Sequence, residues 1–214
     1  MALAFVQASS NGTLLTTTTV TLATAPVAGN LLIAMASGVG LRTYTTPTGW
    51  AILTPLTTLG TCSEIAYWKT AAGTEGTALA FTGSLASGNG AMVYEISGAS
   101  TSAPVASFTN ATASTAVTFT SSTPAVANSM AIEFAAPAIA GTTVTVPTGY
   151  IGQTQNTSNH CPRGAYRAAL PISNASAPCT LGSAVDWASL IVVIAPNILS
   201  YNIPQSFQLL GLFR

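Results

Sequence analysis

The residues with the most reactive side chains lie around the only histidine. His160 precedes Cys161, and the remaining cysteines are Cys62 and Cys179. A thiol nucleophile needs a base and an orienting group, yet the only aspartate, Asp186, stands at no spacing that suggests a triad. A tetrahedral zinc site needs four ligands, which would have to converge from separate strands. We therefore predict no enzymatic activity, no metal site and no cofactor.

The cysteines are also candidates for a disulfide. Cys161 and Cys179 flank a predicted hairpin, and a bridge between them would leave Cys62 alone. Because the count is odd and no signal peptide is recognisable, three reduced, half-buried thiols are the simpler interpretation. The sequence leaves open whether Cys161 and Cys179 are bridged.

Three glutamates fall at alternating positions of predicted strands. Glu64, Glu95 and Glu133 accompany the cations Lys69 and Arg167. A pair of carboxyl groups is the arrangement that cleaves glycosidic bonds. Cross-strand ion pairs on an outer sheet face explain the same spacing, and we expect those.

Aromatic residues offer a surface on which a sugar could stack. The candidates are Tyr67, Trp68, Tyr166 and Trp187. Neighbouring strand residues point to opposite faces, so at most one of Tyr67 and Trp68 faces outward. Core packing explains most of these rings, and a glycan site stays an alternative.

Composition excludes several classes of partner. Charged residues make up 5% of the 214 residues, and the net charge is zero. Nucleic-acid binding needs a positive surface, which five Lys and Arg residues do not supply. No apolar run is long enough to span a membrane. The N-terminus lacks the positive region of a signal peptide, so we expect synthesis in a cytoplasm.

The elements that must position these residues are strands. Segments rich in β-branched and aromatic residues alternate with Gly, Pro, Asn and Ser, which predicts an all-β protein. The first expected strands are residues 18–23, 30–37, 50–56, 63–71, 77–83 and 91–97. After a loop at 98–114, further strands are expected at 115–121, 129–137, 150–156, 163–170, 179–184 and 187–195.

The two sets of strands repeat each other. "PTGW" at 47–50 recurs as "PTGY" at 147–150, and residues 28–31 match 127–130. Cys62 and residues 66–67 match Cys161 and residues 165–166, and 91–96 match 189–194. Internal duplication explains these near-constant offsets. We predict an antiparallel, jelly-roll-like β-sandwich of two pseudo-repeated halves, at about 15–98 and 114–196.

The apolar faces suggest that residues 1–196 form one sandwich with a shared core. Leu31, Ile33 and Met35 have counterparts of similar character in Met130, Ile132 and Phe134. Two tandem domains remain the alternative. In the repeated turns Gly49 and Gly149 accept positive φ, and the aromatic residues then enter the core. The expected core rings are Trp50, Tyr150 and Trp187.

Residues 197–214 lie beyond the repeat and are predicted to form a docking arm. The segment is apolar, and Pro204 argues against one uninterrupted helix. It would dock on its own sandwich, for which the face around Ile191 and Val193 is a candidate, or on a partner. Its expected contact residues are Tyr201, Ile203, Phe207, Leu209, Leu210, Leu212 and Phe213.

The order of "TLATAPVAGNLLIAMAS", "PTGW", "EIAYWKTAAGTEGTALAFTG" and "GAMVYEISGAS", with "DWASLIVVIAP" closing the second half, resembles a β-sandwich module. Such modules occur in bacteriophage virion proteins and bacterial surface proteins. The resemblance covers residues 3–196 and implies an antiparallel sandwich on a particle or cell surface. It transfers no catalytic residues, and the arm departs from it.

These observations lead to two functional hypotheses. We expect a capsid decoration (cement) protein on a virion surface, assembled as a homo-oligomer, for which a trimer is expected, and bound to a major capsid or other virion protein. The alternative is a carbohydrate- or receptor-binding appendage that uses the loop "QTQNTSNH" at 153–160.

Overall fold

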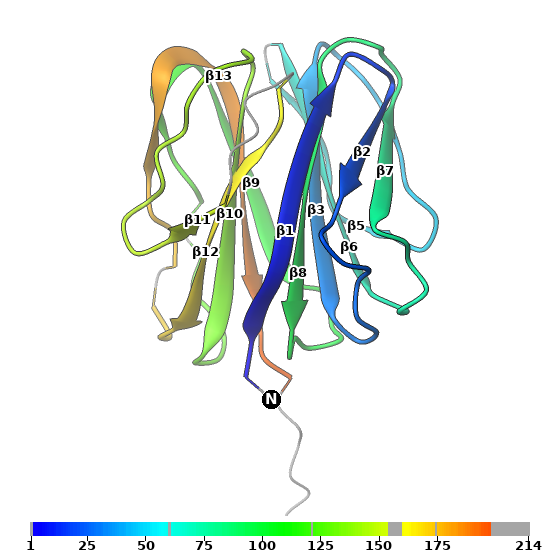
Figure 1. Cartoon of the computed structure of the whole chain (residues 1–214). Helices are drawn as coiled ribbons and strands as arrows, with labels where there is room; N and C mark the ends of the chain where they lie inside the picture. The colour runs from blue at the N-terminus through cyan, green and yellow to red at the C-terminus, as the bar shows by residue number, and fades with distance from the viewer. Residues whose placement is uncertain (1, 60, 121, 154–159, 174, 198–214) are drawn as a thin grey trace, which may run out of the picture.

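The fold is all-β, as predicted. The computed structural model describes residues 2–59, 61–120, 122–153, 160–173 and 175–197. Within these residues the chain forms strands and no helix, in three antiparallel sheets (Figure 1). The arm at 197–214 lies outside the described residues except for Asn197, and so do all seven of its expected contact residues.

The first half contains two of the three sheets. The five-stranded sheet has the order β1 (Ala4–Thr13), β8 (Asn89–Ser97), β3 (Leu31–Val39), β6 (Cys62–Thr70) and β5 (Ala51–Leu59). A three-stranded sheet of β2 (Thr17–Thr21), β7 (Ala78–Gly83) and β4 (Tyr44–Thr45) covers its outer face. Non-consecutive neighbours in both sheets give the strand order of a jelly roll.

The second half repeats this plan around a second five-stranded sheet. Its sheet has the order β11 (Ile151–Gly152), β12 (Arg163–Leu170), β10 (Ser129–Pro137), β13 (Cys179–Ile194) and β9 (Val105–Val117). The end of β9 pairs with the start of β13 at Val117 and Cys179, and an isolated bridge joins Val144 to Leu181. These pairings form an outer layer where the first half has its three-stranded sheet.

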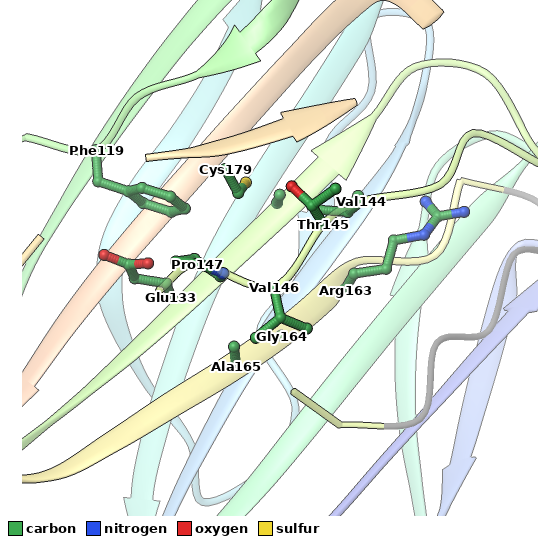
Figure 2. A pocket seen from close by; sticks show the side chains of 11 residues that line it. Phe119, Glu133, Val144, Thr145, Val146, Pro147, Arg163, Gly164, Ala165 and Cys179 are labelled. Carbon is green, nitrogen blue, oxygen red and sulfur yellow. The ribbon is translucent and has the colours of Figure 1, made fainter. Parts of the chain in front are cut away.

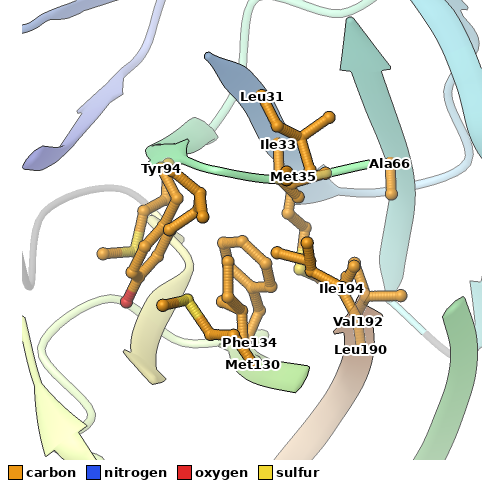
Figure 3. Packing of buried hydrophobic residues seen from close by; sticks show 14 of the residues in the cluster. Leu31, Ile33, Met35, Ala66, Tyr94, Met130, Phe134, Leu190, Val192 and Ile194 are labelled. Atoms are coloured by element: carbon orange, nitrogen blue, oxygen red, sulfur yellow. The ribbon is translucent and has the colours of Figure 1, made fainter. Parts of the chain in front are cut away.

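The inner faces of the two five-stranded sheets meet in one large apolar cluster (Figure 3). Tyr94 of the first half packs edge-to-face on Phe134 of the second, with 5.3 Å between ring centroids. The matching inner faces predicted from the repeat are confirmed. The fully buried side chains of this cluster include Leu31, Ile33, Met35, Met92, Ile96, Met130, Ile132, Leu190 and Val192.

The outer faces of both sheets are buried as well, which corrects one expectation. Ile191 and Val193 are 1% and 6% exposed, because Tyr150, Leu170 and Ala175 cover them. They offer no open landing place for the arm. Each half has its own outer layer, so an apolar residue on an outward sheet face is not a surface residue here.

The repeated turn has the same geometry in both halves. The Trp50 N–H donates to the Pro47 carbonyl at 3.1 Å, and the Tyr150 N–H donates to the Pro147 carbonyl at 3.0 Å. Gly49 and Gly149 have φ of 77° and 83°. Both aromatic rings enter the outer clusters, not the central one.

One anchor of the predicted repeat is displaced by a residue. Ile33 pairs with Trp68, and its counterpart Ile132 pairs with Tyr166. Trp68, and not Tyr67, is therefore the equivalent of Tyr166, and Cys62 is not the equivalent of Cys161. Side chains alternate between the two faces of a strand. The one-residue displacement therefore exchanges the residues that point to the central core with those that point away from it.

Besides the two-residue β4, two longer strands were missed by the pattern. β1 occupies residues assigned to no element, and most of β9 lies in the predicted loop at 98–114. Both are edge strands of their sheets, and both are half-exposed and rich in Ser, Thr and Ala. Their composition does not show the apolar alternation on which the prediction relied. The two strands predicted at 179–184 and 187–195 are one, β13.

Candidate functional site

The three glutamates are buried, which contradicts the expected outer-face ion pairs. Glu95 is fully buried on β8 and accepts hydrogen bonds from three groups. The donors are the Val27 N–H at 2.8 Å, the Asn30 side-chain amide at 2.6 Å and the Gln7 side-chain amide at 2.6 Å. Glu95 therefore holds the segment before β3 against β1 and has a structural role.

Glu64 lies on β6 with 1% of its surface exposed. Neither carboxyl oxygen accepts a hydrogen bond of normal geometry. Burial raises its pKa to about 8, although the adjacent Cys62 thiol and Arg42 oppose the shift. Burial therefore favours the protonated form of Glu64.

The third glutamate lines a small pocket in the second half (Figure 2). Glu133 accepts a hydrogen bond from the Ala177 N–H at 2.9 Å through Oε1, while Oε2 has no partner. Burial raises its pKa to about 7, against the effects of the Ala177 N–H and the Tyr150 hydroxyl. The pocket is otherwise lined by Phe119, Ala135, Val144, Thr145, Val146, Pro147, Arg163, Gly164, Ala165 and Cys179.

In the first half, a side chain occupies the place that is equivalent to this pocket. Register makes Ala165 the counterpart of Tyr67, and Glu133 the counterpart of Ala34. The Tyr67 ring occupies this place in the first half, whereas the small Ala165 leaves a cavity in the second half. The centre of a water molecule can move through about 20 Å³ of this cavity. This volume accommodates about one water. A sugar does not fit in this volume.

Lys69 has a different partner from those predicted, and Arg167 forms no ion pair within the described residues. The Lys69 ammonium pairs with Glu75 at 2.5 Å. Although burial opposes it, hydrogen bonds from the Ala72 N–H and from Lys69 lower the pKa of Glu75 to about 2. Within the described part of the chain, this is the one ion pair between side chains.

The His160 and Cys161 pair has a packing role. The Ser37 hydroxyl of β3 donates to the His160 carbonyl at 2.6 Å, and the Cys161 thiol points to the Ala91 carbonyl at 3.6 Å. A Cβ at Gly90 would lie 2.4 Å from Cys161 Cα, so only glycine lets this segment lie on the first half. Burial, the largest cause, lowers the pKa of His160.

The three cysteines are free and fully buried, not half-buried as expected. Burial raises the pKa of Cys161 to about 11 and that of Cys179 to about 12, which suppresses the nucleophilic thiolate. No three His, Cys, Asp or Glu side chains in the described ranges lie close enough to bind a metal ion. Asp186 accepts hydrogen bonds from Thr61 and from the Ala113 N–H, and thereby links the two halves.

The aromatic residues form no sugar-stacking platform. Tyr67 and Trp187 are 0% and 2% exposed. Tyr166 stacks on Phe5 at 4.6 Å, and Trp68 packs partly buried against the central core. Tyr67 and Trp68 do point to opposite faces, as predicted. The loop at 153–160 lies outside the described residues except for its ends, Gln153 and His160.

The accessible candidates for function are apolar side chains. Large hydrophobic residues are exposed on loops and edge strands of a surface that has few charges. The sequence patterns did not single them out, because an apolar residue type does not by itself show whether a side chain is exposed. They are Val6, Leu14, Leu15, Val27, Leu41, Ile52, Leu56, Leu85, Val105, Ile139, Val146, Ile151 and Ile172.

Comparison with known proteins supplies no relative. A scan against protein-family models gives no match, and no curated protein or solved structure shows significant similarity to the chain. Among the described residues, no helix has the length and apolarity to cross a membrane.

Proposed function

We propose that this protein is a virion structural protein of the capsid decoration type, which binds a protein shell as a homo-oligomer. The observation that carries the proposal is the set of exposed large hydrophobic side chains on a surface with few charges. Scattered apolar side chains are normal on a monomer, but leucines gathered on neighbouring loops mark contact surfaces.

The mechanism requires contact and no chemistry. Burying apolar surface between subunits contributes about 25 cal/mol per Å², before the cost of association. With 5% charged residues, few ionic groups would lose water when these surfaces meet. The packed β-sandwich would serve as the body that positions the contact loops.

Shell binding tests the proposal directly. Purified protein is mixed with phage shells that lack their decoration, and the shells are sedimented and imaged at side-chain detail. We expect the protein at defined positions of the shell lattice and a higher temperature of shell disruption. Failure to bind any shell, together with a specific signal on a glycan array, would replace decoration by the appendage function.

A further inference from the structure

Three loops of the first half meet at one end of the molecule. They follow β1 at residues 14–16, follow β3 at 40–43 and join β7 to β8 at 84–88. In Figure 1 this is the end at which β1 and β3 finish and β8 begins. Each loop carries leucine, and we call Leu14, Leu15, Leu41 and Leu85 the leucine end.

Hydrogen bonds fix the three loops to one another. The Asn89 side-chain amide donates to the Leu15 carbonyl at 2.6 Å and to the Leu85 carbonyl at 2.7 Å. The buried Arg42 guanidinium donates to the Asn89 side-chain oxygen and, at 2.6 Å, to the Ser87 carbonyl. One buried pair, Arg42 and Asn89, therefore contacts all three loops and holds them in place before any partner arrives.

The leucine side chains point into solvent from this fixed base. Leu14, Leu15, Leu41 and Leu85 are 64%, 67%, 74% and 40% exposed. The only ionisable residue of the three loops is Arg42, and it is buried. A partner that fits this end is apolar and uncharged.

The chain contains such a partner at its C-terminus. Residues 198–214 read "ILSYNIPQSFQLLGLFR", in which Arg214 is the single charged residue. The described chain ends at Asn197, whose N–H donates to the Gly98 carbonyl at 2.7 Å, just after β8. The segment therefore begins at the opposite end of the molecule from the leucine end (Figure 1).

The same chain is poorly placed to cover its own leucine end. The ten residues of β1 connect the two ends and, at about 3.3 Å each, span about 33 Å. About ten residues of segment 198–214 would be used to cross this distance. A second copy has no such distance to cross and offers the whole segment for contact.

We propose that the leucine end binds residues 198–214 of a second copy of this chain. The contact is head-to-tail, so successive copies close into a ring where the rotation allows it. A ring is the form in which the proposed decoration protein would encircle a symmetry axis of a shell. Only the location of the ring on a shell rests on the proposed function, because the contact between copies forms without a shell.

Complementary full-length variants test the contact. Leu14→Ser with Leu41→Ser removes the leucine end, and Leu210→Ser with Leu212→Ser alters the segment. Sedimentation is measured for each variant, and Val27→Ser with Ile172→Ser is the matched control. We expect oligomers for the wild type and the control, and at least a tenfold higher dissociation constant for the first two variants.

Mixing the two variants gives a result that is specific to a head-to-tail contact. The leucine-end variant keeps an intact segment, and the segment variant keeps an intact leucine end, so the mixture should form 1:1 dimers that do not grow. A mixture that stays monomeric overturns the proposal, as does a leucine-end variant that assembles like the wild type. Shells are absent throughout, so a failure to decorate would not affect this result.

Crosslinking tests the contact without the serine substitutions, so the proposal remains testable if one of those variants misfolds. A photo-crosslinking amino acid replaces Leu41, and isotopically heavy and light chains are mixed in equal amounts. Crosslinks from position 41 of heavy chains to residues 198–214 of light chains are expected. Crosslinks confined to single chains, or to other segments, would show that the occupant is not the neighbouring copy's C-terminus.

Discussion

At the scale of residues, two buried carboxyl groups make stability depend on pH. Burial raises the pKa of Glu133 to about 7 and that of Glu64 to about 8. Their ordinary value, near 4.5, applies in the unfolded chain. Between these values the folded protein holds more protons than the unfolded chain, so the free energy of unfolding falls as pH rises.

We therefore expect maximal stability at mildly acidic pH. From pH 4.5 to pH 8 the free energy of unfolding should fall by about 3 kcal/mol through Glu133 alone. Glu75 acts in the opposite sense, because its lowered pKa makes stability fall from pH 4.5 towards pH 2. Urea unfolding across this pH range measures the curve.

Glu133→Gln isolates one contribution to that curve. The amide oxygen can still accept the Ala177 N–H, but the side chain no longer titrates. The decline between pH 4.5 and pH 7 should become shallower, whereas stability at pH 4.5 should change little. An unchanged slope would mean that Glu133 ionises normally in the folded protein.

Glu95 should be the most sensitive of the glutamates to truncation. Glu95→Ala leaves the part-buried Val27 N–H and the buried Asn30 amide without their acceptor, and we expect a loss of about 3 kcal/mol. Ser97→Ala, at the exposed end of the same strand, is the control and should cost less than about 0.5 kcal/mol. Equal losses in urea unfolding would contradict the structural role of Glu95.

At the scale of elements, the repeated turn depends on two glycines. Gly49→Ala and Gly149→Ala place a side chain at positive φ, where alanine is strained, so each should cost about 1 kcal/mol. The turns lie in different halves, so the losses should add in the double variant. Gly76→Ala is the control, since its Cβ would have no neighbour closer than 4.0 Å. Thermal unfolding measures all four.

The elements also show what the sequence could predict. Buried strands such as β10 and β12 were placed at their observed bounds, because both ends carry turn residues. β1 and β9 were missed since an edge strand needs fewer apolar side chains. The one-residue slip at Tyr67 and Trp68 was invisible to an alignment by residue type, because aromatic residues occupy both positions.

At the scale of the whole molecule, the central cluster couples the halves. Phe134→Ala should lower the free energy of unfolding by about 3–5 kcal/mol, because the ring is buried against Tyr94 of the other half. Hydrogen exchange read by mass spectrometry should accelerate in both β3 and β10. Acceleration confined to β10 would indicate two halves that unfold independently.

The candidate site was less predictable than the fold. The sequence analysis did not single out Leu14, Leu41 and Leu85, because their exposure becomes visible only from the positions of the loops that carry them. Conversely, Glu64 and Glu133 were placed on a surface because carboxyl groups are rarely buried. An added outer layer over each sheet buries these carboxyl groups, and nothing local in the sequence reveals it.

The buried thiols can report local unfolding of the sheets that surround them. Cys62 belongs to the first half, and Cys161 and Cys179 belong to the second. Because the native thiols are shielded and protonated, an alkylating reagent can modify them only when the surrounding sheet separates. Mass spectrometry of partially alkylated protein would then record, cysteine by cysteine, which half opens first, with no mutation introduced.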